Sequence, residues 1–429
     1  MIWYHNLVSV SETMNKKSKL KHRRKRRIPI RELNIDFDDI WEPIYLVLLA
    51  TFVGMRFLLS TMFTIYWPEY FYRTLLVIGI TLVMLHLMTV KDMQKKEIAA
   101  MAIVTFIFLM SHYVSGYDFL VDLLILILGA YRVDFEKILK TYMAVWVVLM
   151  AITIVGALTG AAENLVYHQG ENGERTRMAL GICYPTDFAA YVAYMMFVFV
   201  CLRDKYITYI EIGAMAVLAG VVYWITDART DFIVMMMLVI ALVMTKLFSK
   251  KFKEMMRKKS VIVCCMALPA IVFIITVLLS LNFDYANVSQ MNLDAKMSGR
   301  LSLGKNALGA YPFKLFGQYV FEHGAGGSTD YSDYYFFIDS SYLSIAIKYG
   351  LVFLILVWTD IIHILKKMWN KYCNYMILCV MMVLIQSIME HHYIQYWYNP
   401  YLIFAFSYIG IKKNNSSMLK NDNEILNLN

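Results

Sequence analysis

The stretch VIVCCMALPAIVFIITVLLSL, residues 261–281, decides the fold class of this chain. It carries no charged side chain, and it is long enough to cross the hydrocarbon core of a bilayer, which takes about 20 apolar residues in a helix. Residues 351–365 form a second, almost continuously apolar run. Such runs disfavour a β-barrel, whose strands would alternate apolar and polar residues over about 10 positions. The sequence therefore predicts membrane-spanning helices.

The composition of the whole chain agrees with this prediction. Of 429 residues, 59% are hydrophobic and only 17% are charged, which excludes an ordinary soluble globular protein. We expect an all-α, polytopic integral membrane protein with about 12 transmembrane helices. The expected helices are centred near residues 55, 80, 106, 125, 150, 194, 216, 239, 270, 350, 382 and 404.

Two connections between the expected helices are much longer than the others, residues 161–185 and residues 282–337. Loops longer than about 15 residues in a compact protein are usually functional or disordered. The second loop keeps many apolar side chains, so we expect it to be folded. Within it, Ser298 is predicted to cap a short helix that Pro312 ends. The predicted organisation is a basic tail (1–41), a polytopic membrane domain (42–412) and a second tail (413–429).

The distribution of Lys and Arg predicts the orientation in the membrane. Most of the 41 basic residues lie in the tails or in every second connection, and basic residues collect on the cytoplasmic side of membrane proteins. We therefore expect both termini in the cytoplasm and both long loops on the outer face. The basic run from Lys21 to Arg27 is interpreted as an orientation signal and an anchor for anionic lipids. Nucleic-acid binding is disfavoured because no aromatic platform accompanies this run.

Several catalytic and metal-binding motifs are missing from the sequence. It has no GxxxxGK[ST] phosphate loop, no HExxH motif and no GxSxG nucleophile elbow. His391 and His392 are adjacent, and adjacent side chains diverge on a helix, so no metal site is predicted. Most cysteines lie within or beside apolar runs, where we expect them to pack in the core. No cofactor is predicted.

Arginine is concentrated in the parts of the chain assigned to the outer face, at Arg175, Arg177, Arg229 and Arg300. Each of them could be ion-paired, and Arg229 has an aspartate two residues away on either side. Together, however, they run against the tendency of basic residues to stay inside. A guanidinium group holds phosphate oxygens by two parallel charge-assisted hydrogen bonds. The four arginines therefore predict a site for a diphosphate leaving group.

A hydroxyl that attacks such a donor benefits from a carboxylate or an imidazole as its base. The candidate bases are Asp339, His323, Glu322, Asp187 and His168. Asp339 ranks first because it ends the large loop where an apolar helix is expected to begin. Its alternative role is to cap that helix, since two serines follow it.

Short motifs follow one another in a characteristic order between residues 40 and 412. They are RTRMALGICYPTD at 175–187, DARTD at 227–231, SGRLSL at 298–303, KLFG at 314–317, IDSSYL at 338–343 and KYG at 348–350. In this order, and with this arrangement of spans, the chain resembles the bacterial Wzy-type oligosaccharide repeat-unit polymerases. These enzymes make capsules, exopolysaccharides and O-antigens, and they are related to the O-antigen ligases.

The resemblance implies a C-type glycosyltransferase-like membrane fold and a metal-independent reaction. The donor would be an undecaprenyl-diphosphate-linked oligosaccharide at the outer face of the bacterial cytoplasmic (inner) membrane, and an acceptor sugar would displace polyprenyl diphosphate. A flippase and a chain-length regulator are the implied partner proteins. By position, Arg229, Arg300 and one or both of Arg175 and Arg177 would hold diphosphate and glycan. Asp339 or His323 would act as the base, with Arg229 and Arg300 as further catalytic residues.

Two other functions remain open from the sequence. A ligase of the same fold would move a finished glycan to another acceptor. In ligases the place of Asp339 and the next residue often carries His-Asn, so the sequence favours a polymerase. A transporter of lipid-linked sugar would place polar residues near the middle of the membrane, often in two matching halves. No matching halves are visible, although four polar residues are predicted at membrane depth, namely Arg56, His86, Glu211 and Lys348.

Overall fold

The computed structural model describes residues 37–65, 68–169, 175–324, 327–328 and 335–409. Among these residues, eight helices are long and apolar enough to cross a membrane. They are α2 (Phe37–Leu59), α3 (Glu69–Thr89), α4 (Lys95–Ser115), α6 (Phe135–Thr159), α7 (Pro185–Arg203), α8 (Tyr209–Thr226), α9 (Arg229–Leu247) and α11 (Lys259–Leu281). The prediction of an all-α, polytopic membrane protein is confirmed. Both predicted tails lie largely outside the described residues, and so does the basic run from Lys21 to Arg27.

The remaining elements are shorter or more polar. The α-helices among them are α5 (Phe119–Gly129), α10 (Ser249–Arg257), α12 (Val288–Lys296), α13 (Arg300–Ala310), α14 (Ser341–Ser344), α15 (Leu351–Asn370) and α16 (Asn374–Gln386). One π-helix, η2 (Ile345–Tyr349), and three 3₁₀ turns complete the helical elements: η1 (Asp204–Tyr206), η3 (His392–Ile394) and η4 (Pro400–Ile403). Strands β1 (Val166–Gln169) and β2 (Arg175–Met178) pair antiparallel, with Val166 opposite Met178.

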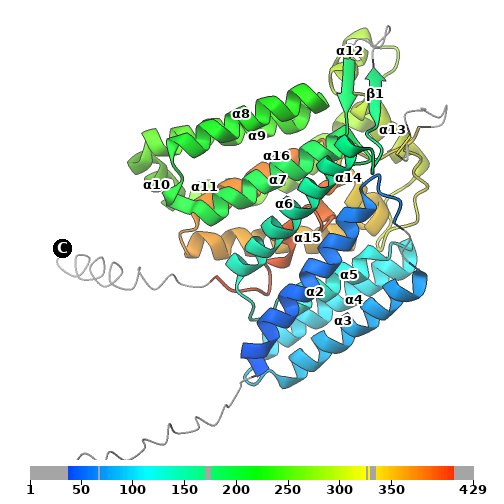
Figure 1. Ribbon diagram of the computed structural model, residues 1–429. Helices are drawn as coiled ribbons and strands as arrows, with labels where there is room; N and C mark the ends of the chain where they lie inside the picture. Colours follow the sequence, from blue (N-terminus) through cyan, green and yellow to red (C-terminus); the bar gives the residue numbers. More distant parts are fainter. Residues whose placement is uncertain (1–36, 66–67, 170–174, 325–326, 329–334, 410–429) are drawn as a thin grey trace, which may run out of the picture.

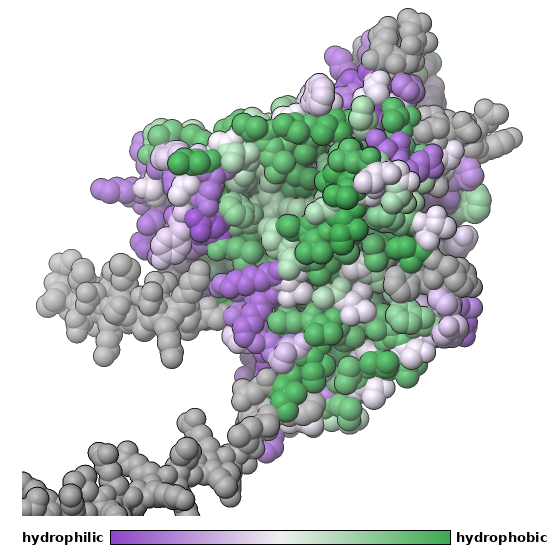
Figure 2. Space-filling view, viewed as in Figure 1, coloured by the Kyte–Doolittle hydropathy of each residue, from purple (hydrophilic) through white to green (hydrophobic). Residues whose placement is uncertain are grey.

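The elements divide the molecule into an apolar middle and two polar ends. In Figure 1 the β1–β2 hairpin, α12 and α13 gather at one end, which we call the hairpin end, while α10 lies at the opposite end. Figure 2 shows apolar side chains across the middle of the visible face and hydrophilic ones toward both ends. This is the surface expected of a bundle that sits in a bilayer.

Helix α7 forms the centre of the bundle. It packs against α6, α8, α9 and α16, and most of its side chains are buried. Pro185 occupies its first position, where the missing N–H group would have had no helical partner. Asp187 lies in the first turn. Since this turn is at the hairpin end, α7 places the carboxyl group of Asp187 at the same end of the molecule as the β1–β2 hairpin.

The last predicted span, centred near residue 404, is not an α-helix. Between Ser387 and Ile409 the chain forms only the turns η3 and η4, yet it is largely buried. A buried irregular backbone needs partners for its polar groups. Here Tyr142 donates to the Tyr396 carbonyl at 2.7 Å, and the Trp146 indole donates to the Trp397 carbonyl at 2.9 Å. The prediction of a helix at this position was wrong because side chains of α6 replace the helical hydrogen bonds.

The predicted span near residue 350 is interrupted. It consists of α14, the π-helix η2 and α15, with Gly350 between the last two at φ 97°. A Cβ atom at Gly350 would lie 2.4 Å from the Leu315 carbonyl oxygen and 2.3 Å from the Gly317 nitrogen. The break therefore lets the chain around residues 315–317 pass directly against the helix.

Two of the residues predicted at membrane depth have structural partners there. Arg56 pairs with the fully buried Asp122, whose Oδ2 lies 3.0 Å from its Nε. His86 is buried, and its Nε2 lies 3.1 Å from the Tyr131 carbonyl oxygen. Glu211 forms the capping box in the first turn of α8.

Candidate functional site

A pocket of about 330 Å³ opens at the hairpin end, and we call it the arginine pocket. Its walls come from β2, the first turn of α7, the α8–α9 turn, the start of α13, the chain before α14 and the chain after α16. All four arginines singled out from the sequence line it, together with the foremost candidate base: Arg175, Arg177, Arg229, Arg300 and Asp339. Residues more than 160 positions apart thus meet in one place.

Strand β2 supplies two of the arginines. Alternate residues of a strand point to the same side, so Arg175 and Arg177 share one face. Arg175 pairs with the Asp227 carboxylate, and Arg177 donates from Nε to the Thr226 carbonyl at 2.9 Å. These contacts dock the hairpin on the end of α8, and both arginines line the pocket.

The turn between α8 and α9 supplies the third arginine. Asp227 adopts a left-handed conformation, φ 46°, that ends α8 and allows α9 to begin at Arg229. The Arg229 side chain is 52% exposed, and its Nε lies 4.0 Å from the Asp227 Oδ1. Asp231 is fully buried and accepts a 2.5 Å hydrogen bond from Gln386. Of the two flanking aspartates, only Asp227 therefore approaches Arg229, and it is shared with β2.

Helix α13 supplies the fourth arginine. The predicted short helix before Pro312 is present, but Ser298 does not cap it. Instead Asp294 accepts hydrogen bonds from the backbone N–H groups of Leu301 and Ser302, at 2.8 and 3.1 Å. Arg300 begins the helix and projects into the pocket.

Arg300 is held by the segment after α16. Its Nε donates to the Met389 carbonyl at 2.7 Å, and its Nη2 donates to Glu390 Oε1 at 2.9 Å. The Asp339 carboxylate lies 4.0 Å from its Nε. The side chain of Arg300 is only 16% exposed, so it joins the large loop, the chain before α14 and the chain after α16.

Asp339 is a pocket residue and does not cap a helix. The helix α14 begins at Ser341, and its first residue receives no side-chain cap from the preceding chain. The Asp339 carboxylate is 19% exposed. Burial raises its pKa to about 6, an effect that nearby Arg300 opposes and Glu390 reinforces. A carboxyl group with this pKa exchanges protons near neutral pH, as a general base requires.

Glu322 and Lys348 form an ion pair next to the chain that carries Asp339. Glu322 accepts a 3.0 Å hydrogen bond from the Ile338 backbone N–H and pairs through its other oxygen with the nearly buried Lys348. Lys348 belongs to the π-helix η2, a type of helical distortion that is frequent at functional sites. Glu322, a candidate base from the sequence, is not among the residues that line the arginine pocket, and it contacts the chain that carries Asp339.

The two other histidine candidates do not reach the pocket. His323 pairs through its backbone with Phe336, and its ring stacks on Phe321 with a centroid separation of 6.4 Å. It is not among the residues that line the arginine pocket. His168 lies on β1, is exposed, and faces Thr176 across the hairpin.

Several ionisable residues of the pocket were not predicted as part of it. Glu390 is nearly buried and contacts Arg300, Asp231 lies close by, and His391 lines the wall. The expectation that His391 and His392 diverge on a helix was wrong, because their ring centroids lie only 4.3 Å apart at the start of η3. Three consecutive ionisable residues in an apolar segment were the available signal.

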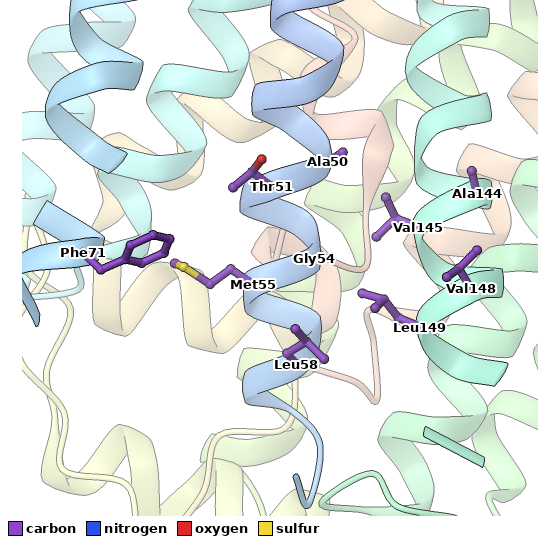
Figure 3. Close-up of a pocket in the computed structure, with 10 residues that line it drawn as sticks. All are labelled: Ala50, Thr51, Gly54, Met55, Leu58, Phe71, Ala144, Val145, Val148 and Leu149. Atoms are coloured by element: carbon purple, nitrogen blue, oxygen red, sulfur yellow. The ribbon is translucent and has the colours of Figure 1, made fainter. Parts of the chain in front are cut away.

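A second cavity has a different character. A groove of about 480 Å³ opens between α2, α3 and α6. Figure 3 shows Val145 and Leu149 of α6 pointing toward α2, while Met55 of α2 points toward Phe71 of α3. Apart from Thr51 its lining is apolar, and none of these residues is ionisable. The groove offers no acid, base or cation, in contrast to the arginine pocket.

The arginine pocket combines four guanidinium groups with the largely buried carboxyl group of Asp339 at one end of a membrane protein. Such a set can bind a multiply charged anion and accept a proton beside it. We find no protein-family profile, no curated protein and no solved structure that matches this chain.

Proposed function

We propose that this protein is a glycosyltransferase that polymerises undecaprenyl-diphosphate-linked oligosaccharide repeat units into a surface polysaccharide. The observation that carries this proposal is the convergence of Arg175, Arg177, Arg229 and Arg300 on one pocket with Asp339. One guanidinium group can bind two oxygens of a phosphate by parallel hydrogen bonds. Several guanidinium groups together therefore match the charge and the oxygens of a diphosphate leaving group. The proposed place of reaction is the outer face of the bacterial cytoplasmic membrane.

The reaction assigns a distinct role to each side of the pocket. A sugar hydroxyl of the acceptor attacks the anomeric carbon of the donor, and the bond between that carbon and the diphosphate oxygen breaks. The hydroxyl proton passes to the carboxylate of Asp339, and a new glycosidic bond forms. The arginines stabilise the negative charge on the departing polyprenyl diphosphate, which is the role of preorganised cations in such a transition state. No exchangeable metal ion takes part in this scheme.

The four arginines contribute unequally in this proposal. Arg300 is held by Met389 and Glu390, so it is a fixed element of the site. Arg229 is half exposed and has the loosest contact, 4.0 Å to Asp227. Its guanidinium group is the one best placed to turn toward an incoming diphosphate. We therefore assign the principal contact with the leaving group to Arg229.

The proposed topology follows from the distribution of charge. The chain would cross the membrane about 12 times, with α5, the broken helix α14–η2–α15, α16 and the irregular segment up to Ile409 completing the eight long helices. Both termini would lie in the cytoplasm and the hairpin end outside. A donor must then be delivered to the outer face, which is the task of a flippase, and a chain-length regulator would act on the product.

The test is an assay of the purified protein in detergent with lipid-diphosphate-linked repeat units and EDTA. A ladder of products on a gel is the expected result. Arg229→Ala should abolish the ladder, while Lys305→Ala should keep it, because Lys305 contacts the Phe283 carbonyl and does not line the pocket. A folded Arg229→Ala variant with unchanged activity would overturn the proposal. Transfer of a preformed glycan to a different acceptor, without a ladder, would replace the polymerase with a ligase.

A further inference from the structure

Beside the arginine pocket, three possible metal ligands come together. Asp187 lies in the first turn of α7, and His391 and His392 lie after α16. One ligand atom of each residue lies within 4.8 Å of the others, and the His392 Nε2 is 3.7 Å from the Asp187 Oδ1. We call these three residues the imidazole cluster. It joins two segments that are more than 200 positions apart in the sequence.

The hydrogen bonding of His392 leaves its inner nitrogen without a partner. Its Nδ1 lies 3.1 Å from the Gln395 Oε1, an arrangement in which Nδ1–H donates to the amide oxygen. The Nε2 atom then carries a lone pair. This atom is buried, has no hydrogen-bond partner among the described residues, and faces the Asp187 carboxylate. Two electron-rich groups that face each other in a buried site require a positively charged species between them.

Buried carboxyl groups near the imidazole cluster also favour a bound cation. Four carboxyl groups lie close together here, on Asp187, Asp231, Asp339 and Glu390. Arg300 contacts Glu390 at 2.9 Å, Arg177 also acts on Glu390, and Arg175 pairs with Asp227. The Oδ2 atom of Asp231 is buried without a partner, and the Oε2 atom of Glu390 lies 4.0 Å from the His392 Nε2. A buried carboxylate oxygen without a hydrogen-bond partner costs free energy, and a bound cation would lower that cost.

We propose that Asp187, His391 and His392 bind a divalent transition-metal ion of the zinc class. Two imidazoles and one carboxylate are a donor set that Zn²⁺ takes, with a fourth position left for water or for a further carboxylate. Gln395 is the outer-shell partner that fixes the His392 tautomer, as carbonyl groups do for metal-bound imidazoles. The ion would tie the start of α7 to the irregular chain after α16 and so stabilise one wall of the arginine pocket.

This proposal goes beyond the proposed transfer reaction and does not depend on it. The leaving group in that reaction is stabilised by the arginines, whereas the metal ion would act on the fold. The experiments on the two proposals are separate, because metal binding is measured here without any glycan donor. Failure of either one leaves the other unaffected.

The test begins with protein purified through a tag that contains no histidine, in buffers without chelator. Mass spectrometry of the eluted metal should find about one zinc ion per chain. After the ion is removed, titration with ZnCl₂ should raise the melting temperature of the wild-type protein, because a ligand that binds only the folded state stabilises it.

Variants locate the bound ion. His392→Gln and Asp187→Asn should abolish the zinc-dependent rise in melting temperature. Gln395→Met should weaken binding roughly 10- to 100-fold, as loss of an outer-shell partner does. His168→Gln is the matched control, because this imidazole lies exposed on β1 outside the cluster, and it should bind zinc like the wild type.

The wild-type protein alone can overturn the proposal. If it contains no zinc after purification and its melting temperature does not respond to ZnCl₂, the imidazole cluster holds a proton instead of a metal ion. The same conclusion follows if His391→Gln and His392→Gln bind zinc as tightly as the wild type and the His168→Gln control.

Discussion

Arg229 and Arg300 line the same pocket but differ in burial and in the closeness of their partners. Arg300 is 16% exposed and holds the Glu390 carboxylate and the Met389 carbonyl. Arg229 is 52% exposed and lies 4.0 Å from its nearest carboxylate, Asp227. The free energy of an ion pair depends strongly on burial, since exposed pairs contribute little and a buried charge without its partner is costly. The two residues should therefore respond differently to truncation.

Arg300→Ala should unfold more easily than the wild type, whereas Arg229→Ala should keep its stability. Loss of Arg300 removes the cation that contacts the nearly buried Glu390, which costs up to about 3–5 kcal/mol. Thermal denaturation in detergent measures the difference as a lower melting temperature for Arg300→Ala alone. Equal melting temperatures of both variants and the wild type would show that Glu390 is neutral in the folded protein and needs no partner.

Arg229→Lys should recover only part of the activity lost in Arg229→Ala. An ammonium group restores the charge but cannot form the two parallel hydrogen bonds of a guanidinium. Loss of one charge-assisted hydrogen bond corresponds to roughly 10- to 100-fold in kcat/KM. The check is the rate of polymer formation with the wild type and both variants at the same protein concentration. Full activity of the Lys variant would show that the reaction needs only the positive charge of Arg229 and not its two parallel hydrogen bonds.

The pH dependence of the reaction should follow Asp339. Its pKa is raised to about 6 by burial, against the opposing effect of Arg300. A general base must be ionised, so kcat/KM should rise about tenfold per pH unit below pH 6 and level off above it. Asp339→Glu should keep an inflection in the profile, and Asp339→Asn should lose both the inflection and most of the activity. An unchanged profile in Asp339→Asn would transfer the role of base to another group.

The arginines of the site and two of its carboxyl groups, on Asp339 and Asp187, were predictable from sequence, while Glu390 and His391 were not. Basic residues in loops assigned to the outer side break a strong compositional tendency, so Arg175, Arg177, Arg229 and Arg300 stood out as a group. Glu390 and His391 were hidden because the segment was expected to continue as a helix, on which neighbouring side chains diverge. Their convergence depends on a turn that only the packing of the whole bundle creates.

At the scale of elements, continuous apolar runs were predicted well and broken ones were not. Helices such as α6 and α11 follow directly from the length of their apolar runs. The chain after α16 is equally apolar, but its polar backbone groups are satisfied by Tyr142 and Trp146, which lie about 250 positions earlier. No local pattern contains that information. The same holds for Gly350. A glycine is required there because residues 315–317, which are distant in the sequence, pass directly against its backbone.

Gly350→Ala should destabilise the protein and disturb the arginine pocket. The new Cβ atom would lie 2.3 Å from the Gly317 nitrogen and 2.4 Å from the Leu315 oxygen, in a backbone with φ 97°. We expect a loss of at least about 2 kcal/mol. Gly213→Ala is the matched control, since nothing lies within 4 Å of a Cβ atom there and the residue belongs to α8. Thermal denaturation compares the two, and equal melting temperatures would show that the crossing chain can move aside.

At the scale of the whole molecule, the apolar middle and the polar ends define two faces of a membrane protein (Figure 2). The arginine pocket belongs to the hairpin end, together with α12. The opposite end carries α10, whose sequence SKKFKEMMR is strongly basic. Since basic segments stay in the cytoplasm, α10 should lie inside and the pocket outside. A substrate presented on a lipid carrier at the outer face would then meet the arginines where the bundle ends.

Labelling of single cysteines tests this orientation. In a background without the native cysteines, Ser289→Cys on α12 should react with a membrane-impermeant maleimide in intact cells, because Ser289 is exposed at the hairpin end. Ser249→Cys on α10 should react only after the cells are permeabilised. Both side chains are exposed in the structure, so a difference in labelling reports the side of the membrane and not burial. The reverse pattern would place the arginine pocket in the cytoplasm, where a lipid-linked repeat unit is assembled and not yet polymerised, and the proposed function would fail with it.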